Sequence, residues 1–257
     1  MRTDSKQLEA GRLTGLSLDN YPLVHERHRI FPEVFENRGH RRILDTSAGI
    51  GIVARRILEN YPCEMHCNEV DEICLTQLRS LDVAVTSHDL DTGETLPFET
   101  GSYDAIICLA TIEHLVNVDF FVQELHRMMK DDGRLYLSVP NYAALYWLAP
   151  LVLKGRTFHD PFGEQSRYEF YAHIRYFTYR TLVDYMDHFG FALDTVYLPV
   201  PKGSTHFLKI RERSKLLAFL IQKSFHALYL FSPRWHQEPV VCFAKKGAGV
   251  KARKRIL

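Results

Sequence analysis

Residues 43–53 of the 257-residue chain read Ile-Leu-Asp-Thr-Ser-Ala-Gly-Ile-Gly-Ile-Val, and this segment is the strongest indication of the fold. Its apolar start predicts a short strand over residues 42–45, and its small residues predict a tight loop that opens a helix over residues 52–60. Small residues let the backbone of such a loop approach a ligand closely, and the N-terminus of the helix favours negative charge. The loop alone is a weak signal, because glycine-rich turns between a strand and a helix serve many purposes.

The pattern outside this loop alternates between strands and helices. Apolar runs predict strands at residues 64–69, 83–87, 103–109 and 134–139, with helices at 71–80 and 118–130. After Pro140 we expect helices at 142–153, 178–189 and 214–231, and strands at 192–199 and 239–244. Strands that alternate with helices of this length indicate βαβ units. The sequence therefore predicts an α/β protein with a seven-stranded, mostly parallel sheet and helices on both faces.

Length and composition favour one domain. The chain is 46% apolar and 25% charged, which suits a single large α/β core with insertions. We expect an N-terminal helical cap over residues 1–40, which includes a helix at 21–36, then the main domain at 41–246 and a basic tail at 247–257. Insertions at about 141–177 and 202–236 are expected to lie over the carboxyl edge of the sheet, where open α/β sheets bind their ligands.

Charge and cysteine usage exclude several classes of partner. The net charge is only +1, so the composition predicts no nucleic acid partner. The basic tail is expected to be solvated and disordered, with contact to anionic lipid as the alternative. The five cysteines and the polar stretch at residues 1–15 predict reduced thiols in a cytoplasmic protein that lacks a secretory signal. We predict no metal site, because Cys63 and Cys67 share one face of a strand and no second ligand pair lies at zinc spacing.

Two acidic residues constrain the ligand. Glu69 ends the second predicted strand, where a carboxylate can bind the hydroxyl groups of a ribose, as in dinucleotide sites. Ala54 supplies a third small residue after the loop, so a nicotinamide or flavin enzyme has to be considered. Asp45 argues against that class, because a carboxylate just before the loop repels a pyrophosphate. It suits instead a ligand that carries an ammonium group and a sulfonium.

Five segments in order resemble the class I S-adenosylmethionine-dependent methyltransferases. The segments are residues 43–51, 68–70, 87–90, 102–115 and 124–135, and the resemblance extends from about residue 41 to residue 191. Within that class the chain is similar to small-molecule enzymes, such as the ubiquinone-biosynthesis O-methyltransferases and methyltransferases of glycan and natural-product pathways. The resemblance implies a Rossmann-like fold, S-adenosylmethionine as the cofactor, and a small-molecule or lipid-linked methyl acceptor.

The resemblance also implies which residues hold the cofactor. Asp45 would organise the loop and bind the methionine ammonium, directly or through water, and Glu69 would accept hydrogen bonds from both ribose hydroxyls. The remaining contacts would be made by Ser47, Ala48 and Gly49 at the methionyl group, Gly51 where the helix packs tightly, Val70, Asp89 and Leu90 at the adenine, and the carbonyl of Ala110 at the ammonium. Ser47 departs from the family, which usually has glycine at this position.

Candidate catalytic residues follow the fourth predicted strand. Methyl transfer is an in-line displacement at a carbon bonded to a positive sulfur, so positioning supplies much of the rate. A base is useful only where the acceptor loses a proton. His114 is the candidate base by its position, and a structural role in the loop is the alternative. His173 and Tyr171 are candidates for substrate contact, with packing as their alternative.

We therefore expect O-methylation of a small-molecule or lipid- or glycan-linked acceptor. N-methylation and a catalytically inactive, cofactor-binding partner subunit are the alternatives. Polar residues interrupt residues 214–231 too often for a membrane-spanning helix. We expect this helix either to pack on the domain or to lie at a membrane surface, so peripheral membrane contact through 214–231 and the basic tail is the second possibility for a cytoplasmic protein.

Overall fold

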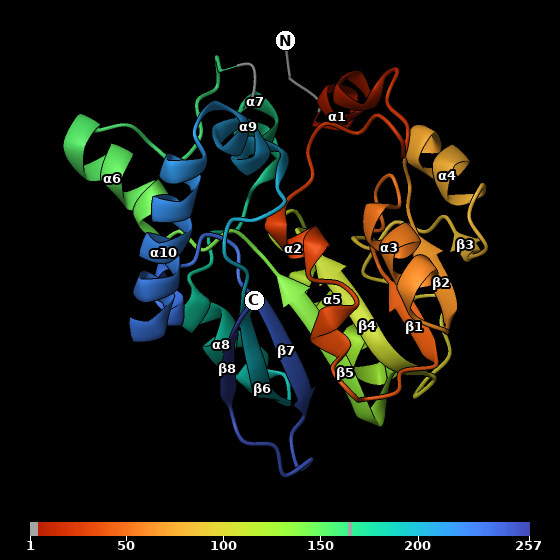
Figure 1. Cartoon of the computed structure of the whole chain (residues 1–257). Helices are drawn as coiled ribbons and strands as arrows, with labels where there is room; N and C mark the ends of the chain where they lie inside the picture. Colours follow the sequence, from red (N-terminus) through yellow and green to blue (C-terminus); the bar gives the residue numbers. More distant parts are fainter. Residues whose placement is uncertain (1–4, 164–165) are drawn as a thin grey trace.

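A mixed sheet of eight strands runs through the protein (Figure 1). The computed structural model describes residues 5–163 and 166–257. In chain order the strands are β1 (Arg42–Asp45), β2 (Glu64–Asn68), β3 (Ala84–Thr86), β4 (Tyr103–Leu109), β5 (Met129–Ser138), β6 (Phe191–Leu198), β7 (Val240–Lys245) and β8 (Arg253–Ile256). Neighbours follow the order β3-β2-β1-β4-β5-β7-β6-β8, and among these described strands β7 alone runs against the others.

Helices connect the strands. They are α1 (Ser5–Leu13), α2 (Glu26–Arg29), the 3-10 helix η1 (Glu33–Phe35), α3 (Ile52–Asn60), α4 (Glu72–Leu78), α5 (Val118–Met128), α6 (Leu145–Lys154), α7 (Arg167–Ala172), α8 (Tyr179–His188), α9 (Thr205–Arg213), α10 (Lys215–Phe231) and the 3-10 helix η2 (Pro233–Trp235). Side chains cap the start of four of them, since Asp71, Thr178, Ser214 and Ser232 accept hydrogen bonds from first-turn N–H groups of α4, α8, α10 and η2.

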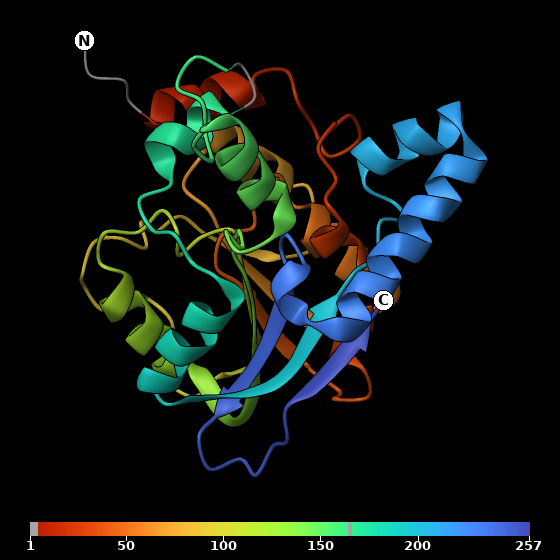
Figure 2. The ribbon, with the colours of Figure 1, turned by 90° about the vertical axis from the view of Figure 1, so that its left-hand side faces the viewer.

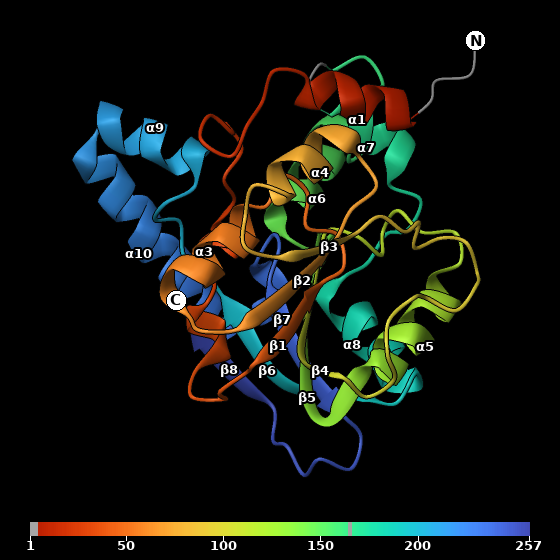
Figure 3. The ribbon, with the colours of Figure 1, turned by 90° about the vertical axis from the view of Figure 1, so that its right-hand side faces the viewer.

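Both faces of the sheet are covered, as the sequence predicts (Figure 3). Ile43 and Ile107 belong to the cluster on one face, which α3 and residues 30–35 cover. Leu44 and Ile106 belong to the cluster on the other face, which α5 and α8 cover. Because neighbouring residues of a strand point to opposite faces, the continuous apolar run of β4 is that of a strand buried on both sides.

The strand order reverses between β1 and β4. The chain runs from β1 outward to β3 and then returns to place β4 beside β1, with Asp45 paired to Ile107. The loops after these two strands therefore meet at the carboxyl edge, the usual ligand position in an open α/β sheet. Helices α1 and α7 lie on this side of the sheet and contact each other (Figure 1), and Arg12 of α1 lies 3.7 Å from Glu169 of α7.

The N-terminal segment differs from the predicted helix over residues 21–36. Only the short α2 and η1 form within that range, whereas α1, which the sequence pattern did not predict, lies further upstream. Two prolines explain the correction, because proline lacks the N–H group that a helix interior needs. Pro22 lies at the start of the range, and Pro32 ends the run and becomes the N-cap of η1. The buried side chains of Ile30 and Phe35 still pack on the sheet.

The C-terminal residues correct a second prediction, because the sheet has eight strands rather than seven and the basic tail is not solvated throughout. Strand β8 pairs in parallel with β6, whose edge would otherwise present unpaired backbone groups. Arg253 and Arg255 form ion pairs with Glu36 at 3.1 and 3.0 Å. Lys254 Nζ donates to the carbonyl of Tyr229 over 3.1 Å. These basic side chains therefore have partners inside the protein.

Two apolar helices bury very little of their surface. Helix α6 has no buried residue, and α10 buries only Ala218 and Tyr229. Both helices lie on the side of the molecule that faces the viewer in Figure 2. Residues 214–231 thus pack on the domain at only a few positions. None of the described helices is long and apolar enough to cross a membrane.

Candidate functional site

Glycines shape the loop between β1 and α3. Gly49 and Gly51 have φ angles of +53° and +91°, in the left-handed region that favours glycine. A Cβ atom at Gly51 would lie 3.1 Å from Leu78 Cδ2, so a larger residue would also press on α4. The start of the loop is anchored by Thr46, whose N–H donates to the carbonyl of Ile107 over 3.0 Å. The loop backbone is therefore held at the carboxyl ends of β1 and β4.

The carboxylate of Glu69 joins this loop to the end of β2. Its Oε2 accepts a hydrogen bond from the N–H of Gly49 over 2.8 Å, and its Oε1 accepts from the N–H groups of Val70 and Asp71 over 2.7 and 3.2 Å. A carboxylate oxygen can accept two hydrogen bonds, so Oε2 keeps a lone pair for a ligand hydroxyl. The side chain of Val70 is 51% exposed beside it and offers an apolar surface to a ligand.

Asn68 sets the spacing of three strand ends, a role that the sequence did not predict. Its buried Nδ2 donates to the carbonyls of Thr46 and His88 over 3.1 and 3.0 Å, and its Oδ1 accepts from the N–H of His88 over 3.0 Å. These bonds hold the loops after β1, β2 and β3 in fixed relation. Asp89 and Leu90 follow directly, with Asp89 exposed and Leu90 buried.

Asp45 is a buried carboxyl group with little to compensate its burial. Its side chain is only 3% exposed, and Oδ1 accepts one long hydrogen bond, 3.4 Å from the backbone nitrogen of Ser47. Burial raises the pKa of Asp45 to about 7, and the negative charge of Glu69 adds to the rise. A cation bound here would stabilise the carboxylate. Asp45 therefore fits the ammonium group of a ligand.

Two hydroxyl groups join the loops after β1 and β4. Ser47 Oγ hydrogen-bonds to Thr111 Oγ1, which donates to the carbonyl of Leu109 over 3.2 Å. Ser47 thus links the two loops in this chain. Ala110, next to Thr111, has a φ of +52°, and such a conformation costs about 1–3 kcal/mol in a residue with a side chain. Strain of this kind clusters at ligand sites, and it fixes the direction of the Ala110 carbonyl.

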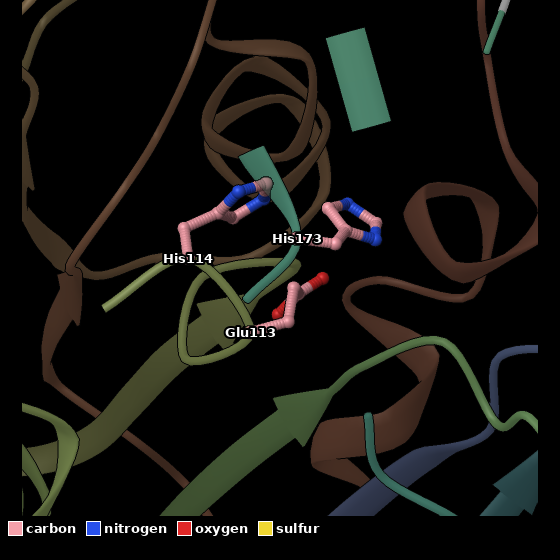
Figure 4. Close-up of side chains that lie close together, drawn as sticks. All are labelled: Glu113, His114 and His173. Carbon is pink, nitrogen blue, oxygen red and sulfur yellow. The ribbon is translucent and has the colours of Figure 1, made fainter. Parts of the chain in front are cut away.

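Three ionisable side chains meet beyond the end of β4 (Figure 4). Glu113 and His114 come from the loop after β4 and His173 from the end of α7, and one donor atom of each lies within 4.8 Å of the other two. Glu113 is fully buried, and neither of its carboxyl oxygens has a hydrogen-bond partner. Burial raises the pKa of Glu113 to about 8 and lowers the pKa values of His114 and His173 to about 4 and about 3. Both histidines are therefore uncharged at neutral pH.

Hydrogen bonds orient both imidazole rings. His114 Nδ1 lies 3.2 Å from the carbonyl oxygen of Ala172, so Nδ1 carries the hydrogen and Nε2 keeps a lone pair. His173 Nδ1 hydrogen-bonds to the hydroxyl of Tyr142 over 2.9 Å. The same hydroxyl lies 2.8 Å from Nε2 of the buried His159. The sequence did not predict Tyr142 or His159, because they reach the cluster only through the fold of the insertion after β5.

Of the two predicted substrate contacts, His173 joins this cluster. Tyr171 is 39% exposed, and its ring packs against that of Phe170 with 5.2 Å between centroids. Tyr168, one turn earlier in α7, contacts the ring of His114 with 5.9 Å between centroids. The sequence pattern gave no sign of Tyr168 because it did not predict α7, a helix of six residues.

The two loops thus form two halves of one candidate site. Asp45 and Glu69 lie on the β1 side, and His114 lies on the β4 side with its neighbours Glu113 and His173. The buried carboxyl group of Asp45, which accepts only a long hydrogen bond, fits the ammonium group of S-adenosylmethionine, and Glu69 fits its ribose. When bound, that cofactor supplies a methyl group attached to a positively charged sulfur. The chain's own residues must then hold the acceptor in line and accommodate its proton.

Comparisons with known proteins show the family to which the chain belongs. A family model described as a methyltransferase domain matches residues 17–196. A malonyl-acyl-carrier-protein O-methyltransferase of Geobacter sulfurreducens is 30% identical over 128 residues, which cover 45% of this chain and 45% of that protein. The chain spans about half the length of the curated relatives it matches.

Solved structures share the fold at low sequence identity. An S-adenosylmethionine-dependent methyltransferase of Archaeoglobus fulgidus has a TM-score of 0.58 and 16% identity, with 94% of this chain and 100% of that chain covered. A phosphoethanolamine N-methyltransferase of Haemonchus contortus, solved with phosphomonomethylethanolamine and S-adenosylhomocysteine, has a TM-score of 0.57 and 16% identity, with 85% and 52% covered. The predicted Rossmann-like fold is confirmed, with one strand more than expected.

Proposed function

Because the chain belongs to the class I S-adenosylmethionine-dependent methyltransferase family, we propose that it O-methylates a small-molecule or lipid- or glycan-linked acceptor. One observation carries the proposal. A buried group of ionisable side chains, Glu113, His114 and His173, begins three residues after Ala110, beside the loop that fits the cofactor. Such a group is suited to an acceptor that must lose a proton as it is methylated.

The cofactor half of the proposal rests on Asp45 and Glu69. Asp45 binds the methionine ammonium, which compensates its burial, and Glu69 accepts from the ribose hydroxyls while it holds the N–H of Gly49. Val70, Asp89 and Leu90 surround the adenine. The strained Ala110 directs its carbonyl toward the ammonium. Ser47, Ala48 and Gly49 line the methionyl group, and Gly51 lets α3 begin close to α4.

The acceptor half rests on His114. Its Nε2 is the ring nitrogen that the Ala172 carbonyl does not use, and it is the atom that meets the acceptor in this proposal. A pKa of about 4 makes His114 a weak base, so it can take the proton only from a group that ionises readily or whose own pKa is lowered nearby. His173 packs against it with 4.7 Å between ring centroids and helps to hold the acceptor.

N-methylation is favoured by one specific observation. The carboxyl group of Glu113 is fully buried without a hydrogen-bond partner, and an acceptor amine would supply one. In that case Glu113 binds the acceptor as an ion-pair partner, and no strong base is needed. An inactive, cofactor-binding subunit is the remaining alternative. Ser47, which departs from the family's usual glycine, hydrogen-bonds to Thr111 and supports the loop.

Methyl transfer with a labelled cofactor tests the proposal. The full chain is incubated with trideuteromethyl S-adenosylmethionine and candidate phenols, polyprenyl phenols, glycans and amines, and products are searched for the mass of one added methyl group. Fragmentation and NMR then locate the methyl group on oxygen or nitrogen. We expect an oxygen product. Methylation on nitrogen selects the alternative, and binding of S-adenosylhomocysteine without turnover on any acceptor overturns the assignment of an active enzyme.

A further inference from the structure

Glu113 has an unusual environment for a carboxyl group. Its side chain is fully buried, and both oxygens lack a hydrogen-bond partner. A buried carboxyl group is costly unless it is paired, hydrogen-bonded or bound to a metal ion. The neighbouring imidazoles of His114 and His173 pack against each other with 4.7 Å between ring centroids, and neither forms a hydrogen bond to the Glu113 carboxyl group. The buried carboxyl group of Glu113 therefore has room for an additional partner.

The two histidines are arranged as metal ligands are. Each one uses Nδ1 for a hydrogen bond, His114 to the carbonyl of Ala172 and His173 to the hydroxyl of Tyr142, so each ring has Nε2 left for a ligand bond. Metal-binding histidines characteristically hold their second ring nitrogen in this way, which fixes the orientation of the ring. Figure 4 shows both rings on the side of Glu113 to which its carboxyl group points.

We propose that Glu113, His114 and His173 bind one divalent first-row transition-metal ion through the Glu113 carboxylate and the Nε2 atoms of the two histidines. Two imidazoles and one carboxylate are a ligand set typical of Zn²⁺ and of Fe²⁺ or Mn²⁺ and are unlike the all-oxygen sets of Mg²⁺ and Ca²⁺. Three protein ligands leave further positions open, as in catalytic rather than structural sites.

The donor atoms must move together when the ion binds. One nitrogen of each ring and one carboxylate oxygen lie within 4.8 Å of one another, whereas metal–ligand bonds of about 2.1 Å bring tetrahedral ligands to about 3.4 Å. The ligands come from two segments, the loop after β4 and the end of α7. The N–H groups of Ile174 and Arg175 donate to the carbonyl of Glu113 over 3.0 and 3.1 Å, so the two segments are joined beside the site and small side-chain rotations close it.

A bound ion explains how the site deals with the acceptor proton, and this part of the inference rests on the proposed function. An acceptor hydroxyl in an open position of the ion has a lowered pKa and releases its proton to water near neutral pH. His114 then acts on the acceptor through the ion and not as a free base.

Titration of the full chain tests the site. Untagged protein is treated with EDTA, dialysed and titrated with Zn²⁺ by calorimetry against a competing chelator, and with Co²⁺ by visible absorption, which reports coordination directly. We expect one equivalent of each metal and little response to Mg²⁺. Glu113→Gln, His114→Asn and His173→Asn should each weaken binding at least about 100-fold, and Tyr142→Phe should weaken it about 10–100-fold.

The variants are chosen to keep the fold. Asparagine places an amide nitrogen near the position of Nδ1, so His114→Asn keeps the bond to Ala172 and loses only Nε2. His226, an exposed histidine of α10, gives the matched control His226→Asn, which should bind as the parent does. Thermal melting and titration with S-adenosylhomocysteine on each variant report whether the protein is folded.

Three outcomes separate the proposals. Stoichiometric Co²⁺ absorption that the three ligand variants abolish and the control retains supports the site. Absence of such binding, or equal binding in the ligand variants, overturns it while S-adenosylhomocysteine binding leaves the proposed function standing. Metal binding without any S-adenosylhomocysteine binding supports the site and overturns the proposed function.

Discussion

The carboxyl group of Asp45 illustrates how a single residue makes the folded protein sensitive to pH. The unfolded chain loses this proton near the ordinary value of 3.8, whereas the folded protein retains it to about pH 7. Between these values the folded state binds more protons than the unfolded state, so the free energy of unfolding falls as the pH rises. Above pH 7 the folded protein bears the full destabilisation that comes from burying the ionised carboxylate of Asp45.

Asp45→Asn should therefore stabilise the protein in the absence of ligand, because asparagine is never charged and still accepts the hydrogen bond from Ser47. Relative to the parent, we expect no gain below pH 4 and a gain of about 1–3 kcal/mol above pH 7, which is several degrees in Tm. Thermal melting from pH 4 to pH 8 measures it. The same variant should bind S-adenosylhomocysteine more weakly, and a pH-independent difference in Tm would show that Asp45 is ionised throughout.

Glu69 accepts hydrogen bonds from backbone N–H groups and, in the proposed function, from the ribose, and two substitutions at this position test the second role. Glu69→Ala should weaken S-adenosylhomocysteine binding by about 1–3 kcal/mol, because the ribose loses a charged hydrogen-bond partner and the N–H groups of Gly49 and Val70 lose theirs. Glu69→Gln should cost less, since one oxygen remains to accept. Calorimetry measures both affinities, and the exposed Glu94 gives a control, Glu94→Gln, that should change neither. Unchanged affinity in Glu69→Ala would place the ribose elsewhere.

The site residues that follow β1 and β2 could be predicted, because a residue at the carboxyl end of a predicted parallel strand lies at the ligand-binding edge of the sheet. Asp45 and Glu69 end strands, and the carboxyl ends of neighbouring parallel strands share one edge. Glu113 and His173 are different. They lie 60 positions apart in the numbering, so only the folded insertion brings them together and only the resulting burial removes the partners of Glu113. No sequence pattern records that burial.

At the scale of elements, strongly patterned segments were predictable to the residue. Helix α3 and strand β4 begin and end where their apolar pattern does. The elements that the pattern missed are short or polar. Helix α9 buries only Phe207, and β8 consists of two arginines, a lysine and an isoleucine, so neither shows a hydrophobic period. Such elements depend on tertiary contacts. In β8, for example, Arg253 and Arg255 form ion pairs with Glu36.

Strand β5 contains a segment whose composition predicts a turn rather than a strand. The segment Asp131-Asp132-Gly133 has the composition of a turn, but it lies inside a strand that runs from Met129 to Ser138. At this segment the pairing of β5 with β4 shifts in register, between the pairs Tyr103–Met129 and Ala105–Arg134. Gly133 allows it, because a Cβ atom there would lie 2.7 Å from Met129 Cγ. A sequence with the composition of a turn can therefore form a β-bulge when the residues on both sides of it pair with a neighbouring strand.

At the scale of the whole molecule, α6 and α10 give one side an exposed apolar surface. On α10 the most exposed apolar side chains are Leu216 and Phe231, at 70% and 85%, and on α6 they are Val152 and Leu153, at 77% and 79%. Apolar patches of this kind mark interaction surfaces. Helices α9 and α10 also carry basic residues, namely Lys209, Arg211, Arg213, Lys215 and Lys223. Apolar residues flanked by lysine and arginine are typical of helices that lie in the surface of an anionic membrane.

We therefore expect the protein to sediment with vesicles that contain phosphatidylserine and much less with vesicles of phosphatidylcholine alone. Added salt should reduce this binding, because it screens the basic residues. Leu216→Ser combined with Phe219→Ser removes two exposed apolar side chains that lie three positions apart on α10. Each contributes about 1–3 kcal/mol when buried in an apolar phase, so the double variant should partition at least about 10-fold more weakly. Val116→Ser, at an exposed apolar position outside both helices, is the matched control and should partition as the parent does.

The comparison between the two variants decides what the apolar surface does. Loss of vesicle binding in the α10 variant, with the control and the Tm unchanged, would show that α10 holds the protein at the membrane surface. A protein held there would favour a lipid-linked acceptor over a freely diffusing one. If instead neither lipid mixture binds the parent protein at low salt, the membrane role of α10 is wrong. The exposed side chains of α6 and α10 then need a protein partner, which size-exclusion chromatography of the parent and the α10 variant would reveal as a difference in apparent mass.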